Sequence, residues 1–262
     1  MTWTTRPRSD AFGLPCILAG AGPRIVLLHG VGLRAEAWGA QIDGLSGDHS
    51  VAAYDMHGHG DAPRLDGLAS LPAYTDRLAE AMGAGAVVAG HSMGAMIALD
   101  LATRYPHLVQ GVVAMNAIFQ RTTEAAHAVR QRAAALDRMH VADPSGPIAR
   151  WFGDRETDAA QACRRWLEQV DPAGYRDAYT VFAHADGPAP SDLLNMQVPA
   201  LFLTGADDPN STPSMSRAMA QMAPKARAKI VEGAAHMLPM THAAEVNDIL
   251  RAFIRTCLPK GA

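Results

Sequence analysis

Short apolar runs, many of them rich in β-branched residues, alternate with amphipathic stretches along most of the chain, and this alternation limits the fold more than any other feature. The apolar runs cover residues 24–30, 50–55, 86–90, 111–115, 200–205 and 228–233. Most of them are apolar at consecutive positions, which is typical of parallel strands buried on both faces. Residues 75–82, 93–105 and 246–254 have the spacing of helices with one apolar face. The pattern predicts an α/β protein with a mainly parallel sheet and helices on both faces.

The alternation stops between Asn116 and Val198. Consecutive stretches in this region predict helices without an intervening strand, at residues 122–139, 144–152, 157–170 and 171–185. Asp171 and Pro172 are a typical helix start, because the carboxylate caps free N–H groups and proline fits the first turn. We therefore expect one core domain made of residues 1–118 and 197–262, with residues 119–196 inserted as a helical cap over the sheet.

Composition excludes several classes of protein. A chain of 262 residues that is 48% hydrophobic and 19% charged suits a globular domain with a large core. The net charge of −3 and the scattered basic residues argue against a nucleic-acid partner. The three cysteines, at positions 16, 163 and 257, form no C-x-x-C pair, which favours a reducing compartment. No run is long enough to span a membrane, and the segment 1–22 lacks a cleavage site, so we expect a cytoplasmic protein. The composition is also compatible with a homo-oligomer.

A serine stands at the junction of a predicted strand and a predicted helix. The pentapeptide GHSMG at residues 90–94 fits the pattern G-x-S-x-G around Ser92. The two glycines let the neighbouring chain pass close to a tight turn, because they have no Cβ atom. The turn places the hydroxyl at a helix N-terminus, where free N–H groups favour developing negative charge. We expect Ser92 to be a nucleophile, although the motif alone also fits a serine in an ordinary surface turn.

Later strand ends supply a candidate base and a candidate acid. A serine nucleophile needs a general base, and the base needs a carboxylate to orient it. Asp207 and Asp208 follow the predicted strand 200–205, and His236 follows the predicted strand 228–233. Where a serine nucleophile stands on such a strand-to-helix turn, the acid and then the histidine follow it along the chain, and the same order is present here. The carboxyl ends of parallel strands share one edge of a sheet, so we expect the three side chains to meet there.

These segments together resemble the α/β-hydrolase superfamily over nearly the whole chain. The similar segments are LLHGVG (27–32) for the oxyanion loop, YDMHGHGDA (54–62) for the D-x-x-G-x-G turn, GADD (205–208) for the acid loop and GAAHM (233–237) for the histidine loop. The resemblance implies an α/β-hydrolase fold with a helical cap. The family's spacing from Gly205 points to Asp208 as the acid, with Asp207 as the alternative.

The resemblance also implies a mechanism. Ser92 would attack a carbonyl carbon, His236 would accept the serine proton, and Asp208 would hold the imidazole in the useful tautomer. Water would then hydrolyse the acyl-enzyme. The backbone N–H groups of Val31 and Met93 would stabilise the oxyanion.

The cap adds a looser resemblance. Residues 149–152 and 171–186 are similar to the cap of the 3-oxoadipate enol-lactonases. We expect a small carboxylic ester or lactone as substrate and no cofactor. Other functions stay open: a carbon–carbon bond hydrolase or a cofactor-free perhydrolase or haloperoxidase with the same triad, amide hydrolysis, and a receptor-like hydrolase fold that binds without turnover. Epoxide and haloalkane hydrolases carry aspartate at this turn, so Ser92 counts against them.

Further residues are weaker candidates. Those for substrate contact are Trp38, Asn116, Trp151 and Met237. Core packing is the alternative for Trp38 and Met237, and a turn is the alternative for Asn116. Those for pairing with a substrate carboxylate are Arg150, Arg164 and Arg165, for which an exposed helix surface is the alternative.

One motif suggests a metal. His57, His59 and Asp61 form an H-x-H-x-D pattern, but alanine stands at position 62, where a dinuclear zinc pattern needs another histidine. We expect no metal.

Overall fold

The central element is a sheet that places its carboxyl edge beside the inserted region. The computed structural model describes residues 3–10 and 13–258. Within them the seven-stranded sheet has the order β1-β3-β2-β4-β5-β6-β7. The strands are β1 (Cys16–Ala19), β2 (Arg24–Leu28), β3 (Ser50–Tyr54), β4 (Ala86–His91), β5 (Val109–Met115), β6 (Ala200–Gly205) and β7 (Ala226–Val231). Only the β1–β3 pair is antiparallel among these neighbours. The predicted α/β fold with a mainly parallel sheet is confirmed.

The predicted strands are present, with ends shifted by a few residues. The sequence analysis missed β1, because this edge strand is short and has no long β-branched run. Its burial follows no simple alternation either: Cys16 and Ile17 are both buried, whereas Leu18 is 47% exposed. An edge strand of this kind is held by pairing with β3, which is a non-local contact.

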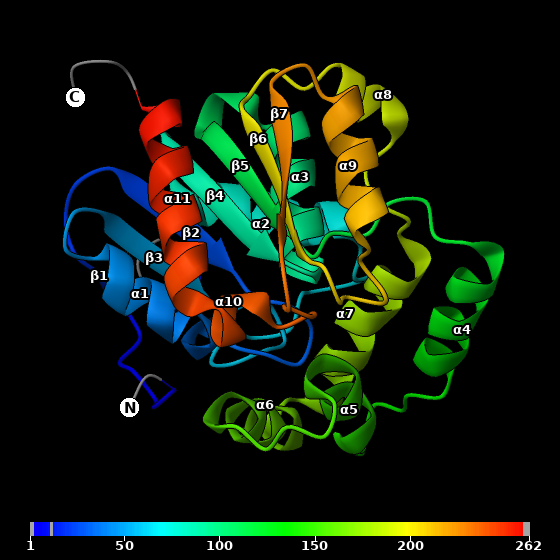
Figure 1. Cartoon of the computed structure of the whole chain (residues 1–262). Coiled ribbons are helices and arrows are strands. Elements are labelled where there is room, and N and C mark those ends of the chain that lie inside the picture. Colours follow the sequence, from blue (N-terminus) through cyan, green and yellow to red (C-terminus); the bar gives the residue numbers. More distant parts are fainter. Residues whose placement is uncertain (1–2, 11–12, 259–262) are drawn as a thin grey trace.

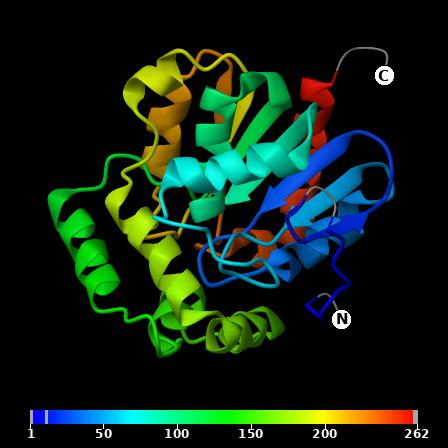
Figure 2. The same cartoon turned by 180° about the vertical axis from the view of Figure 1, so that it is seen from behind.

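Helices cover both faces of the sheet (Figures 1 and 2). They are α1 (Gly39–Leu45), α2 (Leu71–Met82), α3 (Met93–Arg104), α9 (Pro213–Met222), α10 (Leu238–Thr241) and α11 (Ala243–Cys257). Ile25 and Leu27 of β2 pack into the cluster that contains α1 and α11, whereas Val26 and Leu28 pack into the cluster on the other face with α2 and α3. Successive side chains of a strand point to opposite faces of the sheet, and both faces are covered here, so the strand has to be apolar at nearly every position. None of the described helices is both long and apolar enough to cross a membrane.

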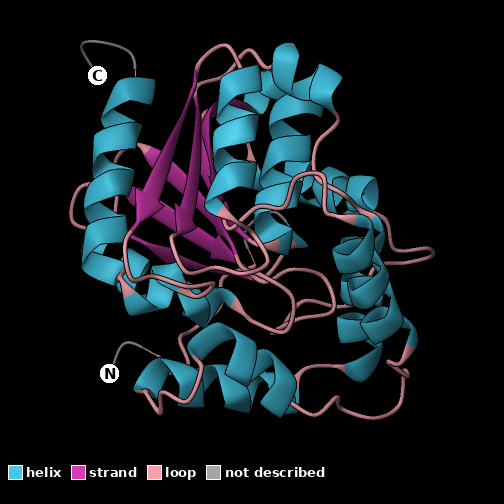
Figure 3. Cartoon of the chain, turned by 45° about the vertical axis from the view of Figure 1, so that its right-hand side comes forward, coloured by secondary structure: helices cyan, strands magenta, loops and turns pink. Residues whose placement is uncertain are grey.

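The region between β5 and β6 is helical, and all of its helices except the short last one, which leads into β6, lie beyond the carboxyl ends of the strands (Figures 1 and 3). Its described residues form α4 (Thr123–Ala134), α5 (Ser145–Phe152), α6 (Asp158–Gln169), α7 (Pro172–His184) and α8 (Pro190–Leu194). The side chains of Thr122, Thr157 and Asp171 accept hydrogen bonds from the first turns of α4, α6 and α7. Helices α1, α8, α9 and α10 were not predicted from the sequence.

Candidate active site

The nucleophile candidate lies on a strained turn between β4 and α3. Ser92 has φ 55° and ψ −115°, a conformation that is costly for a residue with a side chain and that marks functional turns. The turn is tight enough that a Cβ atom on Gly90 would stand 2.0 Å from the carbonyl oxygen of Gly94. The backbone therefore requires glycine at position 90. The side chain of Ser92 lines a cavity at the carboxyl edge of the sheet.

The histidine and the acid candidates meet beside this cavity. His236 Nδ1 is 2.8 Å from Asp208 Oδ2. Asp208 is 2% exposed, whereas the neighbouring Asp207 is exposed and accepts no hydrogen bond from His236. Of the two aspartates that follow β6, the structure therefore brings Asp208 to the imidazole. The His236 ring lines the same cavity as Ser92.

Asp208 is held as a carboxylate by several donors. Its Oδ1 accepts the backbone N–H groups of Asn210 and Ser211, and its Oδ2 accepts Asn116 Nδ2 at 2.7 Å as well as His236. Burial alone would raise the pKa of Asp208, but the nearby imidazole and these hydrogen bonds outweigh burial and lower the pKa to about 2. An ionised Asp208 only accepts hydrogen bonds, so Nδ1 of His236 carries the proton and Nε2 is left as a base.

A second buried imidazole fixes the position of His236. His91 Nε2 donates to the backbone carbonyl of His236 at 2.7 Å, and the two ring centroids are 5.0 Å apart. Burial is the main cause that lowers the pKa of His91 to about 3. His91 is therefore neutral at neutral pH and acts as a tether for the histidine loop.

The loop after β2 is tied in a similar way. His29 Nε2 accepts the Met56 N–H at 2.9 Å, so its Nδ1 carries the proton and donates to the Gly30 carbonyl at 2.8 Å. Val31, the next residue in this loop, lines the cavity. Met93 is the first residue of α3. Within the described residues, the N–H groups of Val31 and Met93 donate to no protein oxygen, so both are free for a ligand.

The cavity has the size of a small-molecule site. Its volume is about 390 Å³. Apart from His236, the charged or titratable side chains of its wall are His91, Tyr175, Tyr179 and three arginines, Arg121, Arg132 and Arg150, and no described carboxylate lines it. All three arginines come from the helical region between β5 and β6. The cavity is therefore positive although the whole chain carries a net charge of −3.

The three arginines differ in their partners. Arg121 donates to the carbonyls of Ala185 and Phe182, lies over the Phe182 ring, and has Asp186 3.9 Å away. Burial lowers the pKa of Arg121 to about 10. Arg132 donates to a tyrosine hydroxyl. Arg132 and Arg150 form no ion pair with any carboxylate in the described part of the chain.

Of the four residues expected to contact substrate, one lines the cavity and three do not. Trp151 lines the cavity and its ring stacks on His236, with centroids 6.2 Å apart and planes at 22°. Trp38, Asn116 and Met237 do not line the cavity, and each is at most 1% exposed. Trp38 and Met237 are packed into the apolar clusters, where burial of their side chains is favourable. Asn116 is instead a hydrogen-bond partner of the acid.

The arginine candidates are divided in the same way. Arg150 lines the cavity, whereas Arg164 and Arg165 on α6 do not. The sequence analysis missed Arg121 and Arg132. A signal for Arg132 was present, because Ala125, Ala128, Val129 and Arg132 recur at helical spacing and line the cavity from one face of α4.

The histidine-rich motif after β3 has other partners. His57 Nδ1 bonds to the Pro63 carbonyl and His59 Nδ1 to the His57 carbonyl, while Asp61 pairs with Arg34 at 3.3 Å. Among the described residues, no three His, Cys, Asp or Glu side chains are grouped to hold a metal ion.

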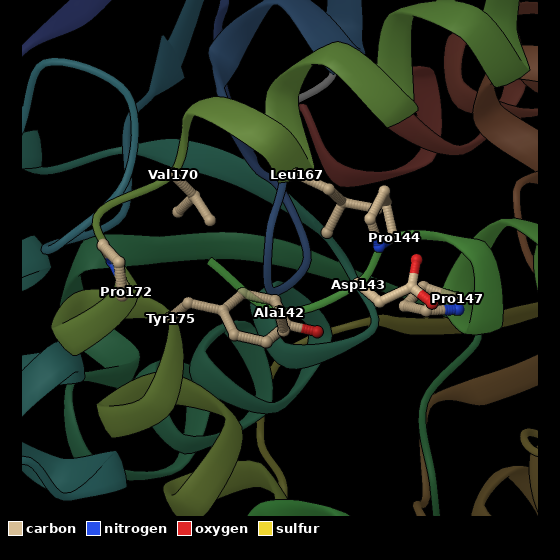
Figure 4. Close-up of a pocket in the computed structure, with 8 residues that line it drawn as sticks. All are labelled: Ala142, Asp143, Pro144, Pro147, Leu167, Val170, Pro172 and Tyr175. Carbon is tan, nitrogen blue, oxygen red and sulfur yellow. The ribbon is translucent and has the colours of Figure 1, made fainter. Parts of the chain in front are cut away.

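A second, much smaller cleft lies within the helical region (Figure 4). Its volume is about 10 Å³, which is room for a single water molecule. Leu167 and Val170 on one side and Ala142 on the other enclose it, and Tyr175 lines both this cleft and the large cavity. The small cleft is too small for a substrate.

The chain is similar to known proteins over most of its length. The profile of the alpha/beta hydrolase family matches residues 25–249. An (E)-2-((N-methylformamido)methylene)succinate hydrolase of Acinetobacter baylyi is 39% identical over 243 residues, which are 90% of this chain and 92% of that protein. A pimeloyl-[acyl-carrier protein] methyl ester esterase of Aromatoleum aromaticum is 28% identical and covers 87% of this chain and 98% of its own.

A solved structure has the same architecture. The enol-lactonase of Burkholderia xenovorans superposes with a TM-score of 0.81 at 24% identity, over 95% of this chain and 100% of that one. At this identity the likeness shows the fold alone. The family profile matches most of the chain, and the 39% identical relative aligns with 90% of it. The chain therefore belongs to the alpha/beta hydrolase family of enzymes.

Proposed function

We propose that the protein is a serine hydrolase that cleaves a small carbonyl compound through an acyl-enzyme. The observation that carries this proposal is the meeting of three strand ends at one cavity. The strained turn at Ser92 and the His236 ring line its wall, and Asp208 orients that ring from behind. Neither a surface serine nor a structural histidine needs this arrangement.

In the proposed reaction, Ser92 Oγ attacks the carbonyl carbon and its proton passes to Nε2 of His236. The N–H groups of Val31 and Met93 bind the oxyanion of the tetrahedral intermediate, since both are free and Val31 lies in the cavity wall. The imidazolium gives its proton to the leaving group, and the bond between the carbonyl carbon and that group breaks. His236 then activates a water that hydrolyses the acyl-Ser92 ester.

We also propose that residues 119–196 act as a cap domain over a core made of residues 1–118 and 197–262. Helices α4, α5 and α7 contribute much of the cavity wall, including the three arginines and Trp151. A cap of this kind limits the size of the substrate and excludes water from the reacting carbonyl.

The substrate that suits this cavity carries a carboxylate. Arg132 and Arg150 have no carboxylate partner among the described residues, and a guanidinium binds a carboxylate through two parallel hydrogen bonds. The 39% identical relative is named for a substituted succinate, which is a dicarboxylate. We propose an ester or lactone of a small carboxylic acid, and as a second candidate an amide of the same charge, because that relative's substrate is named as a formamide derivative.

Active-site labelling tests the reaction type. A fluorophosphonate probe is expected to label the wild-type protein, and Ser92→Ala and His236→Ala are expected to remove the label. Asp208→Asn is expected to slow labelling strongly, and Asp207→Asn is the matched control that labels at the wild-type rate. Unchanged labelling of Ser92→Ala, or loss of labelling in Asp207→Asn alone, would contradict the assignment.

Matched substrates test the charge preference. The p-nitrophenyl monoester of succinic acid and p-nitrophenyl butyrate differ mainly in the distal carboxylate. We expect Arg150→Gln and Arg132→Gln each to lower kcat/KM for the charged ester about 10-fold, the size of one lost charge-assisted hydrogen bond, with little change for the neutral ester. Arg165→Gln, on the exposed surface of α6, is the matched control. Equal losses for both esters would contradict carboxylate binding. A vinylogous diketone is added to the set of substrates, and its hydrolysis would distinguish carbon–carbon bond cleavage from ester hydrolysis.

A further inference from the structure

Asn116 stands directly behind the acid candidate. It follows β5, is fully buried, and has φ 51°, a left-handed conformation that asparagine tolerates better than most residues. Its backbone N–H donates to the Leu203 carbonyl of the neighbouring strand β6 at 2.8 Å. The residue is therefore locked at the carboxyl edge of the sheet and not in the cavity wall.

The orientation of its amide is determined by two acceptors. Nδ2 donates to Asp208 Oδ2 at 2.7 Å and to Thr204 Oγ1 at 3.3 Å. The Thr204 hydroxyl already donates its only proton to the Ser211 carbonyl at 2.7 Å, so towards Asn116 it acts as an acceptor. An amide turned by 180° would place its oxygen against the carboxylate and against this hydroxyl oxygen. The chemistry therefore excludes that orientation.

This amide competes with the imidazole for a single oxygen atom. Asp208 Oδ2 accepts both Asn116 Nδ2 and His236 Nδ1, whereas the backbone N–H groups of the acid loop occupy Oδ1. Oδ1 of Asn116 is buried without a partner in the described part of the chain. An apolar residue would avoid this unpaired oxygen, and glycine would meet the left-handed backbone equally well, so neither burial nor the backbone requires an amide here.

We propose that Asn116 is a positioning residue that acts on His236 through Asp208, an inference that rests on the proposed serine-hydrolase function. Its N–H withdraws charge from Oδ2 and fixes the carboxylate plane towards Nδ1. The carboxylate then stabilises the imidazolium formed after attack without holding its proton too strongly. His236 can therefore return the proton from Nε2 to the leaving group.

The pH profile of kcat/KM depends on His236 and on the charged and titratable groups around it. Asp208 faces its Nδ1, and the neutral His91 ring lies 5.0 Å away. The uncharged Trp151 ring stacks on it, and the cavity arginines 121, 132 and 150 line the same wall. Substitution of Asn116 removes none of these groups. A shift of the acid limb of kcat/KM is therefore attributable to the Asp208–His236 pair.

The test uses Asn116→Gly, because glycine adopts the left-handed conformation without strain and lacks the amide donor. The acid limb of kcat/KM for p-nitrophenyl butyrate is expected to move up by about half to one pH unit, because a more basic carboxylate stabilises the imidazolium. We expect kcat to fall about 10-fold with little change in KM, since the amide does not line the cavity. The matched control is Gln120→Gly, an exposed residue with φ 49°, for which no shift is expected.

An isosteric variant guards against poor folding of the glycine variant. Asn116→Asp keeps the shape, and two buried carboxyl groups this close cannot both ionise, so the new carboxyl group keeps its proton and donates to Asp208 Oδ2 in place of the amide. We therefore expect Asn116→Asp to keep the acid limb nearer to that of the wild type than Asn116→Gly does. Rate losses in both variants without any shift would show a merely structural role and overturn the inference. Failure of the wild-type protein to react with a fluorophosphonate would instead overturn the proposed function.

Discussion

The hydrogen bonds of Asp208 decide the chemistry of its neighbour. Backbone N–H groups occupy one oxygen, and Asn116 and His236 share the other. Because these donors hold the pKa of Asp208 at about 2, the carboxylate is ionised at neutral pH and well below it. The proton of the imidazole is therefore kept on Nδ1.

Removing this charge is expected to affect the rate far more than the structure. Asp208→Asn keeps the size of the side chain but presents an amide that favours the wrong imidazole tautomer. We expect kcat to fall about 10⁴-fold with an unchanged thermal midpoint within a few degrees. Steady-state kinetics with an activated ester checks this, and Asp207→Asn should keep near wild-type turnover. A fall of less than 10-fold in Asp208→Asn would contradict the role of this carboxylate.

Glu36 is a second buried carboxylate, outside the cavity. It is 1% exposed and pairs with Arg8 at 2.7 Å and Arg34 at 2.8 Å. Burial by itself raises the pKa of Glu36, but hydrogen bonds from Arg8 and from the Arg6 backbone, with the nearby guanidinium charges, lower it to about 2. A folded-state pKa below the unfolded value of 4.5 stabilises the fold above pH 4.5, and this contribution is lost as the pH falls towards 2.

The pH dependence of unfolding tests this carboxylate. We expect Glu36→Gln to be less stable than wild type at pH 7, and the difference in unfolding free energy to shrink between pH 4.5 and 2, since only wild type takes up a proton there. Urea titrations across this range measure the difference. Glu80→Gln, on the exposed surface of α2, is the control and should show no such trend. A constant difference at all pH values would contradict the ionised state of Glu36.

At the scale of elements, the turn between β4 and α3 depends on close backbone packing. A Cβ atom on Gly94 would lie 2.2 Å from the Leu28 carbonyl oxygen of the neighbouring strand, and backbone atoms of a central strand cannot move aside. Gly146 has the same second position in α5, but there the nearest atom is the flexible Arg150 guanidinium at 3.3 Å. A comparison of the two positions therefore distinguishes a steric requirement for glycine from the low helix propensity of glycine.

Alanine at these two positions should give opposite results. We expect Gly94→Ala to destabilise the protein by more than about 3 kcal/mol, or to prevent folding. Gly146→Ala should be neutral or stabilise by up to about 1 kcal/mol, because alanine is the better helix former. Thermal unfolding followed by circular dichroism compares them. Similar stabilities of both variants would contradict the tight turn at Ser92.

At the scale of the whole molecule, a stem of hydrogen bonds ties the segment before α4 to the end of α7 within the proposed cap. Gln120 N–H donates to the Asp186 carbonyl, and Arg121 donates to the Ala185 and Phe182 carbonyls. The Arg121 side chain is only 6% exposed.

Loss of this stem should loosen the cap and spare the core. Arg121→Met removes the carbonyl contacts at a cost of roughly 1–3 kcal/mol, because buried carbonyls lose their donor. We expect faster amide hydrogen exchange in residues 119–196 and unchanged exchange in β2, β4 and β5. Uniformly faster exchange over the whole chain would show instead that cap and core unfold as one unit.

Several features were predictable because their signals are local. The strands β2 to β7 are marked by apolar runs, and the serine turn by its glycines. The order of serine, acid and histidine follows from strand ends that share an edge. Elements without a local signal were missed: the edge strand β1 depends on pairing with β3, and α8 and α10 are too short to show a period.

Sequence alone determined the α/β architecture, the turn at Ser92 and the two loops from which an acid and a base come, because propensity and apolar period act between residues close in the chain. Only the tertiary structure brought Asp208, to which the family's spacing pointed, to His236 in preference to Asp207, placed Asn116 behind the acid, and turned Arg132 and Arg150 towards the cavity. Those choices depend on distances between side chains that are remote in sequence, and packing of the sheet against its helices sets these distances.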